Sequence, residues 1–120
     1  MTIAQDLGRE GETIASTYLI EKGFLVKENN WRFRNDEIDI IAENDEFILI
    51  VEVKTRSGIY FGAPEVFVNR AKQKNLIRAA QAYIEKTDSD KEIRFDIIAI
   101  VKTKEKTIIE HIENAFYPTL

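Results

Sequence analysis

The sequence contains no cysteine, a single histidine and only two prolines among its 120 residues. Without cysteine, the chain forms no disulfide and no thiolate metal site. No apolar run approaches the roughly 18–20 residues that a membrane-spanning helix needs. The first dozen residues include Asp6, Arg9, Glu10 and Glu12, whereas a signal peptide would be apolar there. These absences favour a cytoplasmic protein with no membrane segment.

Internal repeats, low-complexity tracts and proline-rich linkers are lacking as well. A chain of this length fits one domain, since domains commonly contain about 100–150 residues. Hydrophobic residues make up 44% of the chain and charged residues 32%, a balance typical of globular proteins. We therefore expect residues 1–120 to form a single domain.

The formal net charge of −4 weighs against a nucleic-acid partner, because phosphate binding needs lysine and arginine. The charge is unevenly distributed, however, and residues 54–78 contain six basic side chains and one acidic side chain. The basic residues are Lys54, Arg56, Arg70, Lys72, Lys74 and Arg78. Such a segment indicates either a surface that attracts a polyanion or a solvated helix face.

Hydrophobic periodicity predicts two helices and five strands. Apolar residues recur at helical spacing before Gly23, a typical helix-ending glycine, and runs rich in valine and isoleucine predict strands. The predicted helices are residues 4–22 and 69–86, and the predicted strands are 24–34, 37–43, 47–55, 93–101 and 107–112. The order α-β-β-β-α-β-β predicts an α/β domain with a mixed five-stranded sheet flanked by helices. A loop with Gly58, Gly62 and Pro64 is expected before the second helix.

The third predicted strand carries charges within an otherwise apolar run. Side chains alternate along a strand, so Glu52, Lys54 and Arg56 share a face with Ile48 and Ile50. A buried charge costs several kcal/mol unless it is paired or bound to a metal. Glu52 and Lys54 therefore indicate either a functional cleft or a structural ion-pair cluster.

Asp39, on the preceding strand, is predicted to join the same face. A two-residue turn at 44–45 would place Asp39 opposite Ile50, whereas a four-residue loop at 44–47 would place it opposite Glu52. In both registers the Asp39 carboxylate lies on the side of Glu52, because cross-strand partners share a face. Two carboxylates this close require a counter-charge.

Paired carboxylates are hard oxygen ligands of the kind that Mg²⁺ or Mn²⁺ binds together with waters and substrate phosphate. The predicted metal ligands are Asp39, Glu52 and the backbone carbonyl of Val53. Lys54 is predicted to orient or deprotonate the attacking water, or to neutralise charge in the transition state. Glu12 lies at the margin of the apolar face of the first helix, where it either reaches the metal cluster or is a surface glutamate.

Arg56, Lys72 and Lys74 are candidates for binding substrate phosphate. An ion pair with an acid explains Arg56 equally well, and a solvated helix face remains an alternative for the two lysines.

Trp31 is interpreted as a core residue rather than a platform for stacking a base. Arg94 and Asp96 alternate on one predicted strand and are interpreted as a structural pair. His111, in the last strand, is also interpreted as structural.

Several short motifs follow one another in order from residue 8 to residue 116. Among them are Gly8-Arg9-Glu10-Gly11-Glu12, Asn30-Trp31-Arg32, Glu37-Ile38-Asp39-Ile40-Ile41, Val51-Glu52-Val53-Lys54-Thr55-Arg56, Arg94-Phe95-Asp96 and Asn114-Ala115-Phe116. With these motifs the chain resembles the YraN family of small bacterial proteins, which is assigned to the PD-(D/E)XK nuclease superfamily. The resemblance implies a restriction-endonuclease-like fold.

The resemblance also implies roles for individual residues. It implies Asp39 and Glu52 as metal ligands, with Lys54 beside them. The similarity to archaeal Holliday-junction resolvases implies a catalytic glutamate at Glu12 and a homodimer. Asp36 stands where the family usually has glycine, and it adds an acid near the site.

Residues and resemblance together predict a divalent-metal-dependent nuclease that hydrolyses phosphodiester bonds in DNA, at branched or nicked structures. The alternative is a nucleic-acid-binding or protein-interaction module that keeps the nuclease fold without catalysis. The acidic net charge favours this alternative.

Overall fold

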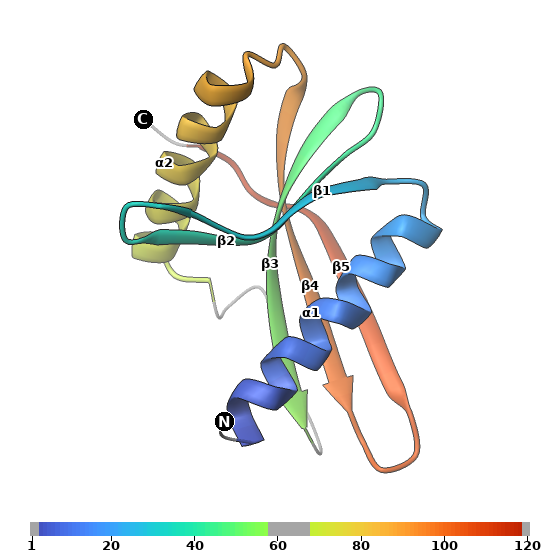
Figure 1. The fold of residues 1–120 in the computed structure, drawn as a ribbon. Helices are drawn as coiled ribbons and strands as arrows, with labels where there is room; N and C mark the ends of the chain where they lie inside the picture. The colour runs from blue at the N-terminus through green and yellow to red at the C-terminus, as the bar shows by residue number, and fades with distance from the viewer. Residues whose placement is uncertain (1–2, 58–67, 119–120) are drawn as a thin grey trace.

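The computed structural model describes residues 3–57 and 68–118 (Figure 1). Its elements are α1 (Ile3–Glu21), β1 (Leu25–Phe33), β2 (Asp36–Glu43), β3 (Phe47–Ser57), α2 (Arg70–Thr87), β4 (Glu92–Lys102) and β5 (Thr107–Phe116). The predicted α/β class and element order are confirmed. The last strand is longer than the predicted 107–112, because β5 stays paired with β4 as far as Phe116. The predicted loop glycines and Pro64 lie outside the described residues.

The five strands form one mixed sheet in the order β1-β2-β3-β4-β5. Neighbouring strands are antiparallel except β3 and β4, which are parallel from Phe47↔Glu92 to Ser57↔Lys102. A parallel pair needs a crossover connection, and α2 lies within the one between β3 and β4. The predicted mixed sheet is confirmed, and β3 is its central strand.

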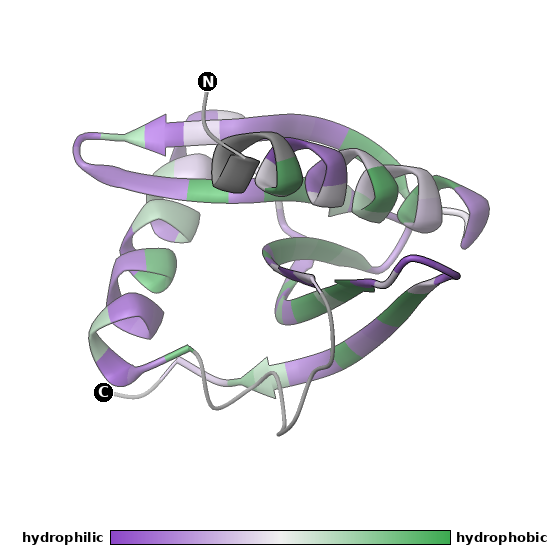
Figure 2. Ribbon diagram, turned by 90° about the horizontal axis from the view of Figure 1, so that it is seen from below, coloured by the Kyte–Doolittle hydropathy of each residue, from purple (hydrophilic) through white to green (hydrophobic). Residues whose placement is uncertain are grey.

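Two apolar clusters cover the two faces of the sheet. On one face, Leu76, Ala79 and Tyr83 of α2 pack against strand residues such as Ile48 and Ile50. On the other face, Ala15 and Leu19 of α1 pack against residues that include Ile40, Ala42, Leu49, Val51, Ile98 and Ile100. Figure 2 shows the same pattern, since the central strands are largely green whereas both helices alternate between green and purple. None of the helices among the described residues is long and apolar enough to cross a membrane.

Two glycines shape α1 in different ways. Gly23 has φ +96° and ends the helix as predicted, because the amides of Gly23 and Phe24 donate to the carbonyls of Ile20 and Leu19. Gly11 faces β3, where a Cβ would overlap with the Thr55 hydroxyl. The absence of a side chain at Gly11 therefore lets α1 approach β3 closely, and this close approach positions the neighbouring Glu12.

The β1–β2 hairpin bends across the sheet toward α2 (Figure 1). Simple alternation along β2 fails, because Ile38 and Ile41 both pack in the α2 cluster while Ile40 packs in the α1 cluster. The irregularity coincides with Asn30 on β1, which has φ 53° and lies between the partners of Ile38 and Ile40. Trp31 follows it and packs edge-on against Tyr83 at 5.4 Å, which confirms Trp31 as a core residue.

Candidate functional site

The β2–β3 hairpin uses the longer of the two predicted loops. The ladder pairs Glu43 with Ile48 and Ile40 with Val51, and the Asn44 amide donates to the carbonyl of Phe47. The Asn44 side chain accepts the Phe47 amide at 2.7 Å, which holds the loop closed. In this register Asp39 follows directly opposite Glu52, and the predicted shared face of the two carboxylates is formed.

The ladder between β2 and β3 ends at the carboxylate of Asp39. Where the next backbone hydrogen bond would form, the Val53 amide donates to Asp39 Oδ2 at 2.8 Å. The side chain of Asp39 therefore replaces a backbone acceptor and fixes its own orientation. The two strands separate at this point, and the carboxyl groups of Asp39 and Glu52 lie together where they diverge.

Glu52 is a buried carboxylate with an incomplete set of partners. Its side chain is only 6% exposed, and Oε2 lies 3.3 Å from the ammonium nitrogen of Lys72 on α2. The geometry is not that of a hydrogen bond, and Oε2 is buried without a hydrogen-bond partner among the described residues. Lys72 is held in register by the helix cap, because its amide donates to the Asn69 side chain at 2.9 Å. Glu52 Oε2 is therefore a buried oxygen that can still accept a hydrogen bond or bind a cation.

The proximity of the two carboxyl groups changes the ionisation of Asp39. Burial, followed by the neighbouring Glu52 carboxylate, raises the pKa of Asp39 to about 8. The Val53 amide and the positive charge of Lys72 oppose this rise without cancelling it. The Asp39–Glu52 pair therefore holds a proton more tightly than an isolated aspartate does. Perturbed carboxyl groups of this kind are characteristic of functional sites.

Glu12 lies close to this pair, on α1. Its pKa is raised by partial burial and then by the charge of Asp39, while a hydrogen bond from Asn30 works in the opposite direction. Glu12 also lines two open cavities between α1 and the β1–β2 hairpin, of about 520 and 480 Å³. The larger cavity is also lined by Gly8, Arg9, Asn30, Arg32 and Glu37. Sequence patterns marked Glu12 but gave no role to Arg9 or Asn30, which become neighbours of Glu12 only through the packing of α1 on β1.

The remaining predicted residues are placed as follows. Lys54 is half-buried on β3, two residues beyond Glu52, and its ammonium makes no hydrogen bond or ion pair with the described residues. Arg56 is half-buried and donates to the carbonyl of Thr55 at 2.9 Å. Lys74 is exposed on α2. Lys72 does not lie on a simple solvated helix face, because it contacts Glu52.

Asp36 does not add a free acid to the site. It is buried, and Arg78 of α2 binds both of its oxygens at 2.9 and 3.2 Å. This bidentate pair ties the start of β2 to α2. Glu37 next to it pairs with Arg32 at 2.9 Å.

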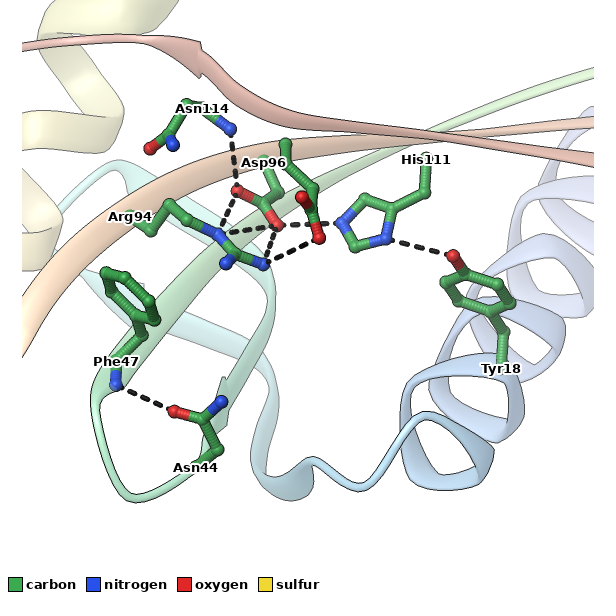
Figure 3. Close-up of polar contacts among 8 residues, drawn as sticks. Tyr18, Asn44, Phe47, Arg94, Asp96, His111 and Asn114 are labelled. Atoms are coloured by element: carbon green, nitrogen blue, oxygen red, sulfur yellow. Dashed lines mark hydrogen bonds and ion pairs between the residues drawn. The ribbon is translucent and has the colours of Figure 1, made fainter.

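Figure 3 shows a second polar network, in which side chains of β4 and β5 are joined to Tyr18 of α1. It lies on the α1 face of the sheet, since Asp96 alternates with Ile98 and Ile100 of the α1 cluster. Arg94 binds Asp96 through two nitrogens, and His111 connects Asp96 at 2.7 Å to the Tyr18 hydroxyl at 3.0 Å. Burial opposes the charge of Asp96, but the hydrogen bonds from His111, Arg94 and the Asn114 amide outweigh it and lower its pKa. The predicted structural pair is present, and the chain from His111 to Tyr18 was not predicted.

The carboxylate pair fits a hard divalent cation. Within residues 3–57 and 68–118 no group of three or more histidine, aspartate or glutamate side chains is arranged to hold a metal ion. A magnesium ion nevertheless needs only one or two carboxylates, with waters and substrate oxygens completing its shell. Such an ion would bind Glu52 Oε2, which has no hydrogen-bond partner among the described residues, together with the neighbouring Asp39 carboxyl group, whose pKa is raised.

The fold and the site together define an α/β protein with a mixed five-stranded sheet and a carboxylate pair, half-buried Asp39 and buried Glu52, where β2 and β3 diverge. The model of uncharacterised protein family UPF0102 matches residues 11–100. The chain is 49% identical over 112 residues to a UPF0102 protein of Flavobacterium psychrophilum, and the matched region covers 93% of this chain and 94% of that protein. It is 47% identical over 112 residues to one of Thermodesulfovibrio yellowstonii, with 93% and 96% covered. The chain belongs to family UPF0102, which confirms the resemblance to the YraN proteins.

Proposed function

We propose that this protein is a divalent-metal-dependent nuclease of the PD-(D/E)XK type that hydrolyses phosphodiester bonds in DNA. The observation that carries the proposal is the Asp39–Glu52 carboxylate pair. Glu52 is buried, one of its oxygens has no hydrogen-bond partner among the described residues, and Lys54 follows two residues later. A protein that needed only stability at this point would gain by apolar residues. Retaining two acids and a lysine there indicates chemistry.

Asp39, Glu52 and the backbone carbonyl of Val53 are the groups that would hold Mg²⁺ or Mn²⁺. When bound, such an ion acidifies water and stabilises negative charge that develops on phosphate. The Val53 amide keeps Asp39 oriented toward the pair through its 2.8 Å hydrogen bond. The close contact between Gly11 and Thr55 keeps α1, and with it Glu12, against the same strands.

Lys54 and Glu12 supply the remaining polar groups of the proposed site. A lysine ammonium beside the reacting phosphate neutralises charge in the transition state or orients the attacking water. Glu12, whose pKa is raised, can accept or hold a proton from a water in the adjacent cavity. Lys74 on the outer face of α2, with Arg56 on β3, is proposed to contact the flanking phosphates.

The test is cleavage of four labelled DNA substrates: a four-way junction, a nicked duplex, a single strand and a plain duplex. Each is incubated with Mg²⁺, Mn²⁺ or a chelator. We expect metal-dependent cleavage that falls at least about 100-fold in Glu52→Gln, with similar losses in Lys54→Ala. Glu110→Gln is the matched control, because Glu110 is an exposed acid on β5, at the edge of the sheet and separated from β2 by β3 and β4, and it should retain cleavage. Cleavage by purified Glu52→Gln at the wild-type rate would overturn the assignment.

A non-catalytic nucleic-acid-binding module is the second candidate. It is favoured by the Lys72–Glu52 ion pair, which already supplies a positive charge to the site without a metal ion. This function requires binding of one DNA structure that is unchanged by chelator and by Glu52→Gln. If the protein is instead a nuclease that prefers the four-way junction, we expect a homodimer, because resolving a junction requires two coordinated cuts.

A further inference from the structure

We infer that the Lys72 ammonium neutralises the Glu52 carboxylate until a divalent metal ion binds there and displaces it. On this view Lys72 is a positioning residue that sets the affinity of the site for metal and then turns its ammonium outward to substrate. The inference rests on the proposed function, because it assumes that the Asp39–Glu52 pair binds a metal ion. It adds a role for Lys72 that its predicted phosphate contact does not include.

The geometry of the ion pair supports an exchangeable cation. The ammonium of Lys72 lies 3.3 Å from Glu52 Oε2, the oxygen for which residues 3–57 and 68–118 provide no hydrogen-bond partner. A metal ion bound to that oxygen at about 2 Å would lie within roughly 5 Å of the ammonium. Two positive charges at that separation repel strongly in a partly buried site. The metal ion and the ammonium therefore compete for the same carboxylate.

The ion pair between Arg94 and Asp96 is built differently. Asp96 accepts two nitrogens of Arg94, the His111 ring and the Asn114 amide, so both of its oxygens are satisfied. Glu52 instead faces the Asp39 carboxyl group and one ammonium, and its Oε2 has no hydrogen-bond partner among the described residues. Lysine is a flexible, strongly hydrated point charge, whereas arginine forms fixed bidentate pairs. The contrast indicates that the contact of Lys72 is suited to be broken.

The Lys72 side chain can also reach solvent. Its side chain is 39% exposed, whereas that of Glu52 is 6% exposed, so the ammonium can swing to solvent while the carboxylate stays in place. The backbone of Lys72 remains anchored by the Asn69 cap at the start of α2. The displaced ammonium then lies at the mouth of the site, where a substrate phosphate would arrive.

The experiment is a titration with Mn²⁺ alone, followed by the electron paramagnetic resonance signal of the free ion. It compares the wild type with Lys72→Met, Lys72→Gln and Lys72→Arg. Both neutral variants should bind Mn²⁺ about tenfold or more tightly than the wild type, because they lack the competing charge. Lys72→Arg keeps a cation that pairs with a carboxylate more firmly, so it should bind Mn²⁺ no more tightly than the wild type. Lys74→Met, which removes an exposed charge from the same helix, should change the affinity less than about threefold.

The outcomes separate this inference from the proposed function. Equal or weaker Mn²⁺ binding in folded Lys72→Met and Lys72→Gln would overturn the exchange and make Lys72 a structural support of Glu52, while leaving a metal site in place. Failure of every variant and the wild type to bind Mn²⁺ at millimolar concentration would overturn both proposals. Mn²⁺ binding that is tighter in the neutral variants than in the wild type, and that disappears when Glu52→Gln is added, would support both.

Discussion

Replacing Asp39 by asparagine should stabilise the metal-free protein, and the gain should grow as the pH rises. Burial and the Glu52 carboxylate raise the pKa of Asp39 in the folded protein to about 8, whereas an unfolded aspartate has a pKa of about 3.9. Between these values the folded state holds one more proton than the unfolded state. The free energy of unfolding therefore falls as the pH increases through this range.

The size of the effect follows from the same shift. Each pH unit between the two pKa values lowers the free energy of unfolding by up to about 1.4 kcal/mol, or about 6 kcal/mol over the whole range. Because relaxation of the local structure reduces the cost of the buried charge, we expect about 4 kcal/mol. Asparagine keeps the oxygen that accepts the Val53 amide and offers an amide donor to Glu52. Because it does not ionise, the variant should exceed the wild type by about 1 kcal/mol at pH 5 and by about 4 kcal/mol at pH 9.

The assay is urea denaturation in the presence of chelator at pH 5, 7 and 9. Unfolding is followed by the fluorescence of Trp31, the sole tryptophan, which packs against Tyr83. Glu37→Gln serves as control, because its surface pair with Arg32 should contribute less than about 1 kcal/mol at any of these pH values. A stability difference between Asp39→Asn and the wild type that stays constant with pH would refute the reasoning. So would a variant that is less stable at pH 9.

Two further predictions concern the parts of the fold that position the site. Gly11→Ala should destabilise the protein by about 1–3 kcal/mol in thermal unfolding, because the new Cβ would overlap with the Thr55 hydroxyl. Gly8→Ala should stabilise it by about 0.5–1 kcal/mol, because nothing lies within 4 Å of the new Cβ and alanine favours the helix. Equal effects of the two alanines would contradict the close approach of α1 to β3. Asp96→Asn should cost about 3 kcal/mol at pH 7 in urea denaturation, and this penalty should shrink as the pH falls below about 4, because the lowered pKa of Asp96 gives stability only where an unfolded aspartate is ionised. A penalty that persists unchanged at pH 3 would show that the charge of Asp96 is not what stabilises the network.

Much of the candidate site could be predicted from local sequence. The period-two alternation along residues 47–55 places Glu52 and Lys54 on one face of a central strand, and that face does not depend on the hairpin register. The same applies to Asp39, because both predicted hairpin registers put it on the side of Glu52. Gly23 ended the first helix as predicted, because a residue with positive φ is needed there.

Alternation failed where the backbone departed from regular strand geometry. Along β2 the faces slip next to Asn30, whose φ of 53° turns Ile38 toward α2. Strand periodicity assumes a uniform backbone, and a single residue in the left-handed region of β1 breaks that assumption for both strands of the hairpin.

The sequence by itself thus determined the elements, their order and the residue types that face one another across β2 and β3, because these depend on neighbours a few positions apart. Only the tertiary structure decided which loop closes the hairpin, that Lys72 contacts Glu52, that Arg78 neutralises Asp36, and that Tyr18 reaches His111 across 93 positions of sequence. These contacts join residues on different elements. They exist because α1 and α2 pack at particular positions on opposite faces of one sheet, and no local periodicity encodes that packing.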